Sequence, residues 1–111
     1  MNSKARTARQ TLRNRIATTH AKARIARKGL ATLATYATAA GLGRKEAASV
    51  AGSLRTNAKK LGINGAAGVA FRKGMRRVCS RFTPAQIHTV AAAYRPRKST
   101  YIAARAALLA V

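Results

Sequence analysis

Residues 57–78 read NAKKLGINGAAGVAFRKGMRRV and combine glycines with cations. Four glycines lie in this stretch, and four of its last seven residues are Lys or Arg. Glycine permits tight turns and a close approach of the backbone to a ligand, while clustered cations attract a polyanion. We therefore expect this stretch both to organise the fold and to contact nucleic acid.

The stretch resembles the helix-turn-helix of DNA-binding proteins over about residues 58–78. That family ends its first helix and makes its turn with A-x-x-L-G-I, and the matching residues are Ala58, Leu61, Gly62 and Ile63. Asn64 stands where an N-cap of the second helix belongs. The resemblance implies a recognition helix from about residue 65 to residue 78. Gly68 departs from the pattern, because the family usually places a branched apolar residue there.

Three other interpretations of the same glycines stay open. The run GINGAAGVAF at 62–71 resembles the helix-hairpin-helix, in which backbone amides at a helix N-terminus hold a phosphate. The spacing of Ile63, Gly65 and Gly68 resembles the I-x-G-x-x-G loop of KH domains, which implies a sheet. The plainest interpretation is a turn between two core helices that contacts no ligand.

A recognition helix over 65–78 would begin with small side chains that cannot reach base edges. Base readout uses Arg, Asn or Gln in the major groove, and only Asn64 and Lys73 are placed for it. The other cations are suited to phosphates, which position a protein without specifying sequence. These phosphate-contact candidates are Arg72, Arg76, Arg77 and Arg81.

The charge balance points to a nucleic acid as the partner. The 111 residues hold 23 Lys and Arg against one acidic residue, a net charge of +22, and the length suits a single domain over 1–111. We expect a DNA-binding protein that clamps the phosphate backbone with low to moderate sequence specificity, in a nucleoid, packaging or regulatory role. Duplex DNA is favoured over RNA. The alternatives are a structural RNA-binding protein, such as a ribosomal component, and an inhibitor that captures an acidic protein or protein–RNA surface.

Several classes of function lack the residues they need. Glu46 is the only acidic residue, so paired carboxylates and a Ser-His-Asp triad are both excluded, and we expect no enzyme. His20 and His88 are too few for a metal site without Cys or carboxylate partners. We expect no cofactor, metal or small-molecule substrate. The longest uncharged run, 29–43, is too short and polar to span a bilayer, so we expect no membrane partner and a cytoplasmic location, on the nucleoid or a ribonucleoprotein.

Residues 4–40 contain no proline and predict a long basic N-terminal helix, whole or broken near Gly29. Apolar and small residues recur in heptads along it, which is compatible with packing on the same chain or with a homodimer seam. The heptad positions are Ala5, Leu12, Thr19, Ala26, Leu33 and Ala40, with Arg9, Ile16, Ala23, Leu30 and Ala37 four residues later. From this helix we expect Arg6, Arg9 and Arg13 to contact nucleic acid.

The remaining residues predict a helical core over about 44–111. A stripe at helical spacing runs from Ala47 to Leu61, with Gly52 inside it as a possible kink. Thr83, Pro84 and Gln86 form the signature of a capped helix start, and Ser99 or Thr100 can cap a last helix. Between these two helices we expect an extended basic arm that enters a minor groove, formed by Arg95, Arg97 and Lys98. No alternating strand pattern is visible, so the predicted fold is all-α, a bundle of five or six helices with a helix-turn-helix-like unit.

Overall fold

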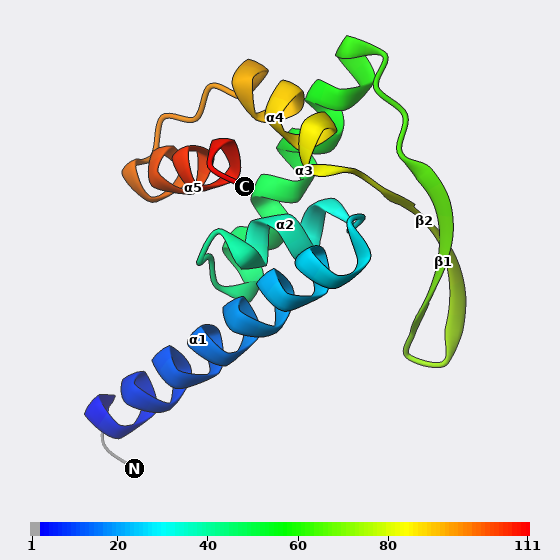
Figure 1. Cartoon of the computed structure of the whole chain (residues 1–111). Helices are drawn as coiled ribbons and strands as arrows, with labels where there is room; N and C mark the ends of the chain where they lie inside the picture. Colours follow the sequence, from blue (N-terminus) through cyan, green and yellow to red (C-terminus); the bar gives the residue numbers. More distant parts are fainter. Residues whose placement is uncertain (1–2) are drawn as a thin grey trace.

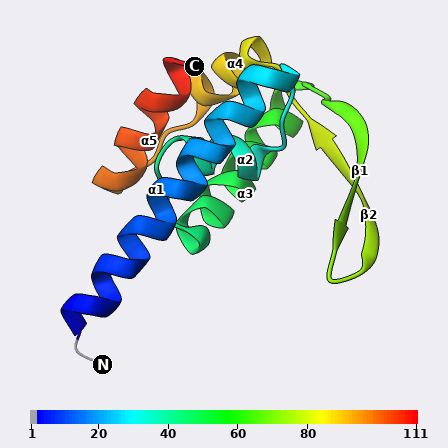
Figure 2. The same ribbon diagram turned by 60° about the horizontal axis from the view of Figure 1, so that its bottom comes forward.

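The computed structural model describes residues 3–111, apart from the side chains of Ala70 and Arg72. Five helices surround an apolar core, and a two-stranded antiparallel hairpin projects from this helical body on one side (Figures 1 and 2). The elements are α1 (Ser3–Lys28), α2 (Leu33–Ala39), α3 (Arg44–Leu61), β1 (Ala66–Arg72), β2 (Met75–Arg81), α4 (Pro84–Ala93) and α5 (Ser99–Leu109).

The predicted helix over 4–40 is wrong in its extent, because the chain breaks after Lys28. Gly29 takes a left-handed conformation (φ +68°), and its N–H donates to the carbonyl of Ile25 at 2.8 Å. A glycine in this conformation ends a helix without the steric cost that a side chain would bring. The break near Gly29 that the sequence allowed is thus confirmed. The next helix, α2, starts at a Thr32 N-cap.

The helix predicted to start near Arg44 is confirmed as α3, and its apolar stripe is buried. The buried residues are Ala47, Val50, Ala51, Leu54 and Ala58. Leu61, the last residue of the predicted stripe, is instead 46% exposed. The helix is continuous through Gly52 and ends at Gly62, which is left-handed (φ +70°). There the N–H of Ile63 donates to the carbonyl of Ala58 at 2.9 Å, so the helix end keeps a backbone partner.

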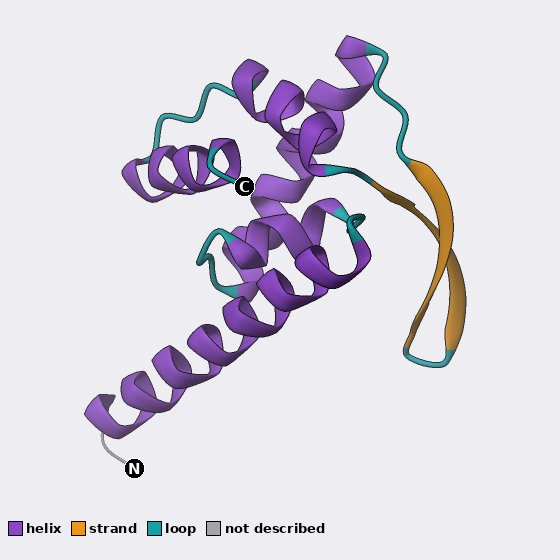
Figure 3. Cartoon of the chain, in the orientation of Figure 1, coloured by secondary structure: helices purple, strands orange, loops and turns teal. Residues whose placement is uncertain are grey.

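The prediction of an all-α fold is wrong at residues 66–81, which form the hairpin of β1 and β2 (Figure 3). No recognition helix runs from 65 to 78, so the helix-turn-helix and helix-hairpin-helix interpretations of this stretch both lose their second helix. The stretch is also neither a KH loop nor a simple turn between helices. Glycines disfavour a helix here, while Val69, Phe71 and Val78 favour strands. Lys73 and Gly74 both have positive φ and form the two-residue turn that a twisted hairpin prefers.

The helix start predicted at residue 83 is confirmed at α4. The Thr83 side chain accepts from the Gln86 N–H, and the Gln86 side chain accepts from the Thr83 N–H at 2.9 Å. The predicted cap of α5 by Ser99 or Thr100 is wrong, since the helix begins at Ser99 itself with Lys98 as its N-cap residue. Arg105 in α5 donates from Nε to the carbonyl of Ala91 at 3.0 Å, which holds α5 against the end of α4.

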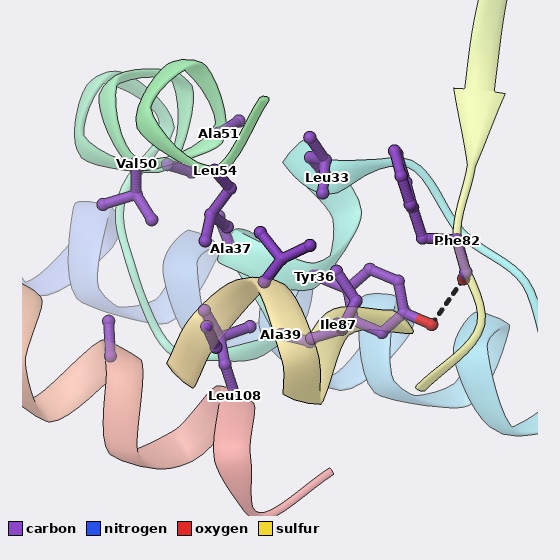
Figure 4. Packing of buried hydrophobic residues seen from close by; sticks show 14 of the residues in the cluster. Leu33, Tyr36, Ala37, Ala39, Val50, Ala51, Leu54, Phe82, Ile87 and Leu108 are labelled. Atoms are coloured by element: carbon purple, nitrogen blue, oxygen red, sulfur yellow. Dashed lines mark hydrogen bonds between the residues drawn. The ribbon is translucent and has the colours of Figure 1, made fainter. Parts of the chain in front are cut away.

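Alanine makes up much of the core, which keeps the helices close together. Nine of the 20 buried hydrophobic residues in the described structure are alanine. Larger side chains fill the centre, and the fully buried ones are Tyr36, Leu54, Ile87, Leu108, Val50 and Val90. In Figure 4 the side chains of α2, α3, α4 and α5 meet around Tyr36, whose hydroxyl donates to the backbone carbonyl of Phe82. The core therefore reaches the point where the hairpin joins the helical body.

Candidate nucleic-acid interface

Helices α2 and α3 are joined by a four-residue turn at 40–43. Gly41 is left-handed in this turn (φ +98°), and Leu42 beside it is buried. Helix α3 then packs the Val50 and Leu54 side of its surface into the core that α2 shares. Because Ala37 of α2 is small and fully buried, the two helices approach closely. The turn therefore fixes one face of α3 inward and the opposite face outward.

The outward face of α3 carries cations toward both ends of the helix and short side chains between them. Lys45, Ser49, Thr56 and Lys59 follow one another along it at helical spacing, with Gly52 in the middle. Further exposed side chains of the helix flank this row: Arg44, Ala48, Ser53, Arg55 and Lys60. Small residues let a helix backbone approach a ligand, while the cations at both ends suit phosphates on either side of a groove. This face is therefore a candidate for contact with nucleic acid.

The hairpin is fastened to the helical body at the end of β2. Ala31 and Phe82 exchange two backbone hydrogen bonds, of 3.1 Å from the Ala31 N–H and 2.8 Å from the Phe82 N–H. The Tyr36 hydroxyl donates to the same Phe82 carbonyl at 2.7 Å. The short segment between α1 and α2 thus pairs with the returning strand of the hairpin. These bonds fix the base of the hairpin next to α2 and α3.

A groove of about 470 Å³ lies between α3 and the base of the hairpin. Arg55 and Lys59 line it from α3, and Asn64 lines it from the link to β1. The carbonyl of Asn64 accepts from the Gln86 side chain at 3.3 Å, so the link is tied to α4. The groove therefore places two cations of α3 beside the base of the hairpin.

Gly65, just before β1, and Gly68, inside it, allow the chain to lie tightly against Arg81. A Cβ at Gly65 would stand 2.7 Å from the carbonyl oxygen of Arg81, and a Cβ at Gly68 would stand 3.3 Å from its guanidinium. Arg81 is half-buried and donates to the carbonyl of Val69 at 3.4 Å. This residue, predicted to contact phosphate, therefore contributes to the hairpin itself.

The structure gathers some of the predicted site residues and separates others. Lys73, Arg76 and Arg77 are exposed on the hairpin, where the turn and β2 present them to solvent. The backbone of Arg72 ends β1, and its side chain lies outside the described part of the structure. Asn64 is exposed at the foot of the same hairpin. Of these positions, Asn64 lines the groove with Arg55 and Lys59 of α3, while Lys73, Arg76 and Arg77 lie further out on the hairpin.

The other predicted residues lie elsewhere on the molecule. Arg6, Arg9 and Arg13 are exposed on the first half of α1, which extends away from the helical body on the side opposite the hairpin (Figures 1 and 2). The link between α4 and α5 carries the exposed arm residues Arg95, Arg97 and Lys98, and Figure 1 places that link far from the hairpin. The outward face of α3 was missed at the sequence level, because its stripe was interpreted only as core.

Residues 3–111 contain neither a membrane-spanning helix nor a cluster of metal ligands. No helix there combines the length and the apolar composition needed to cross a bilayer. No group of three or more His, Cys, Asp or Glu side chains in this part of the chain is placed to hold a metal ion.

Comparison with known proteins yields no relative: the chain matches no protein-family model, no curated protein and no solved structure.

Proposed function

We propose that this protein binds duplex DNA, with α3 in the major groove and the hairpin beside it on the adjacent backbone and minor groove. The observation that carries the proposal is the Ala31–Phe82 pairing, which locks a basic hairpin next to two helices joined by a short glycine-containing turn. The order of elements is helix, extended segment, helix, turn, helix and hairpin. A helix-turn-helix joins two helices by a turn of three or four residues and places the second helix in the major groove. We therefore assign that role to α3 and contact with the adjacent DNA to the hairpin.

The side chains on α3 favour low to moderate sequence specificity. Ser49, Ser53 and Thr56 are exposed hydroxyls, and a hydroxyl can bond to either kind of base. The helix exposes two arginines, Arg44 and Arg55, and an arginine can make a bidentate contact with a guanine. A strong consensus sequence needs several such bidentate contacts. We therefore infer that most of the affinity comes from phosphates and that the helix adds modest discrimination.

A possible homodimer belongs to the same proposal. Leu12 and Ile16 are 58% and 48% exposed on α1, opposite the face that buries Ala21 and Ile25. Nine cations on the same helix repel a second copy in the absence of a polyanion. We propose that two copies pair along this face only when bound to DNA. Sedimentation with and without a duplex tests this.

The experiment for DNA binding is competition among duplex DNA, single strands and folded RNA at about 150 mM salt, a concentration at which phosphate contacts are still measurable. Two double variants separate the surfaces, and each removes two positive charges. Arg55→Ala/Lys59→Ala changes α3, whereas Arg95→Ala/Arg97→Ala changes the distant link between α4 and α5. Counterion release contributes about 0.9 log units of affinity per log unit of salt for each neutralised phosphate. If both α3 cations neutralise phosphates, their loss at about 150 mM salt, relative to about 1 M, removes about 1.5 log units, so the first pair should weaken duplex binding roughly 30-fold.

The outcomes separate the rival functions. Preference for folded RNA would replace DNA binding with the structural RNA-binding alternative. An equal loss in both double variants would contradict the assignment of α3 and favour a clamp that includes the arm at 95–98. Unchanged affinity in Arg55→Ala/Lys59→Ala, with the helical circular dichroism intact, would remove α3 from the interface.

A further inference from the structure

Large apolar side chains are exposed at the outer part of the hairpin. Phe71 is 75% exposed, Met75 is 62% exposed and Val78 is 81% exposed, although the protein has few large apolar residues to spare for its core. Every described residue from 71 to 78 is exposed. Proteins usually bury such side chains unless the surface has a partner. The cations of the hairpin do not account for these exposed apolar side chains.

The strand register places Phe71 at the edge of the turn. It pairs across the hairpin with Arg76, and the Lys73–Gly74 turn begins two residues later. Paired residues of neighbouring strands project from the same face, so Phe71 and Arg76 lie together. Met75 is one position out of phase and belongs to the opposite face. An aromatic ring flanked by cations thus stands on a ribbon only two strands wide.

The charge around this patch identifies its partner. The hairpin carries five cations, at positions 72, 73, 76, 77 and 81, and contains no acidic residue. An apolar protein surface docking here would leave these charges unpaired or would have to be rich in acids. The grooves of a duplex offer stacked bases as apolar surface and phosphates within reach of the cations. The patch therefore complements DNA.

We propose that the hairpin tip enters the minor groove and that Phe71 wedges between two base pairs, kinking the duplex. This inference rests on the DNA-binding function proposed above, with α3 setting the position of the hairpin. Minor-groove proteins insert Phe, Leu, Ile or Met side chains in this manner and bend DNA by roughly 20–90°. Lys73 and Arg76 lie beside the ring, where they can contact the phosphates that border the opened minor groove. Bending then brings more of the basic surface into contact with the backbone.

The wedge also supplies a form of sequence preference that α3 lacks. Pyrimidine–purine steps such as TA unstack most easily, so a wedge selects them without bonding to a base edge. We expect the protein to prefer a duplex with one TA step between stiff A-tracts over a duplex of uniform stiffness. Discrimination then comes from deformation of the DNA.

The test uses the full chain and a fluorescently end-labelled duplex with a central TA step, in which the adenine is replaced by 2-aminopurine. The wild-type protein should shorten the end-to-end distance and raise 2-aminopurine fluorescence, which reports unstacking. Phe71→Thr should retain duplex binding but lose the bend, the fluorescence rise and the preference for TA. Phe71→Leu should keep all three, because leucine also serves as a wedge. Threonine and leucine both leave the five hairpin cations in place, and threonine suits a strand.

Ile102→Ala is the matched control, because Ile102 is 51% exposed on α5, away from the proposed interface. This variant should bend DNA as the wild type does. Duplex binding by the wild type without a bend or unstacking would overturn the wedge and leave the DNA-binding function standing. Absence of any duplex binding would overturn both. Bending by Phe71→Thr equal to the wild type, or DNA-free self-association that this variant abolishes, would also overturn the wedge.

Discussion

Replacing Tyr36 by Phe removes one hydroxyl from the centre of the fold. Tyr36 is fully buried on α2, and its hydroxyl donates to the Phe82 carbonyl at 2.7 Å. This bond connects the helix before the turn to the strand that carries the hairpin back. Phenylalanine retains the ring and its packing, so the variant isolates the hydrogen bond from the apolar contacts.

The structure limits the size of the effect. A hydrogen bond contributes a net stability of about 0.5–1.5 kcal/mol, and the loss is larger when its removal leaves a buried polar group unsatisfied. Here the Phe82 carbonyl still accepts from the Ala31 N–H at 3.1 Å, so the substitution leaves no buried carbonyl without a hydrogen bond. We therefore expect Tyr36→Phe to lower the free energy of unfolding by about 1 kcal/mol, which corresponds to a Tm shift of roughly 4 °C in a domain of this size.

Denaturant unfolding at pH 7 measures this difference, with Tyr101→Phe as the control for loss of a hydroxyl at a half-buried site on α5. The control should change stability by a few tenths of a kcal/mol at most, as surface substitutions usually do. If Tyr36→Phe is as stable as the wild type, the bond between α2 and the hairpin base contributes nothing. A loss of about 3 kcal/mol or more would mean that the Phe82 carbonyl is left without a partner.

Alkaline pH adds an independent check on the same residue. Burial raises the pKa of the Tyr36 hydroxyl above its ordinary value of 10.0. The folded state then holds this proton more tightly than the unfolded chain does, so the contribution to stability is complete below pH 10 and is lost as pH rises through the folded-state pKa. The stability gap between wild type and Tyr36→Phe should therefore narrow above pH 10. The raised pKa of Tyr94, caused by burial and by Tyr101, is present in both proteins and cancels in the comparison.

Three further predictions concern the charge, one glycine and one helix cap. Duplex affinity should fall with salt at a log–log slope of roughly −5 to −9 if about six to ten phosphates are contacted, and a slope shallower than about −2 would contradict backbone binding. Gly52→Ala should raise the free energy of unfolding by about 0.5–1 kcal/mol, because the site is inside a helix and a Cβ there meets nothing within 4 Å. Thermal unfolding measures this change, and a loss of stability would mean that the helix needs the glycine. Thr83→Ala should cost about 1 kcal/mol by removing the acceptor of the Gln86 N–H, while Thr83→Ser should be close to neutral.

Local signals in the sequence predicted α3 and the start of α4. The Thr83–Gln86 capping box depends on residues three positions apart, and the α3 stripe depends on residues within a few turns. Such signals are complete in the sequence and need no tertiary partner. The break at Gly29 was also visible, since glycine in a left-handed conformation commonly ends helices.

The hairpin could not be predicted in the same way, because its strands lack an alternating pattern. Both faces of its outer part meet solvent, so burial imposes no period of two on the sequence, and Ala66 and Ala67 resemble a helix start. The Lys73–Gly74 turn was the available signal, since a residue followed by glycine between two strand-forming runs is typical of a hairpin. The candidate site also differs from the predicted one. Because 65–78 is a hairpin, the candidate helix is α3, whose Arg55 and Lys59 line the groove at the hairpin base.

The pairing of Ala31 with Phe82 has a consequence for how the chain folds. It closes a loop of about 50 residues, whereas each helix and the hairpin turn form from neighbours in sequence. Loop-closure entropy rises with the logarithm of loop length, at about 3.5 kcal/mol for a loop of this size. The local elements should therefore form first, and closure at Ala31 should complete the core late. Because α4 begins two residues after Phe82, this closure also brings the buried side chains of Ile87 and Val90 into the core.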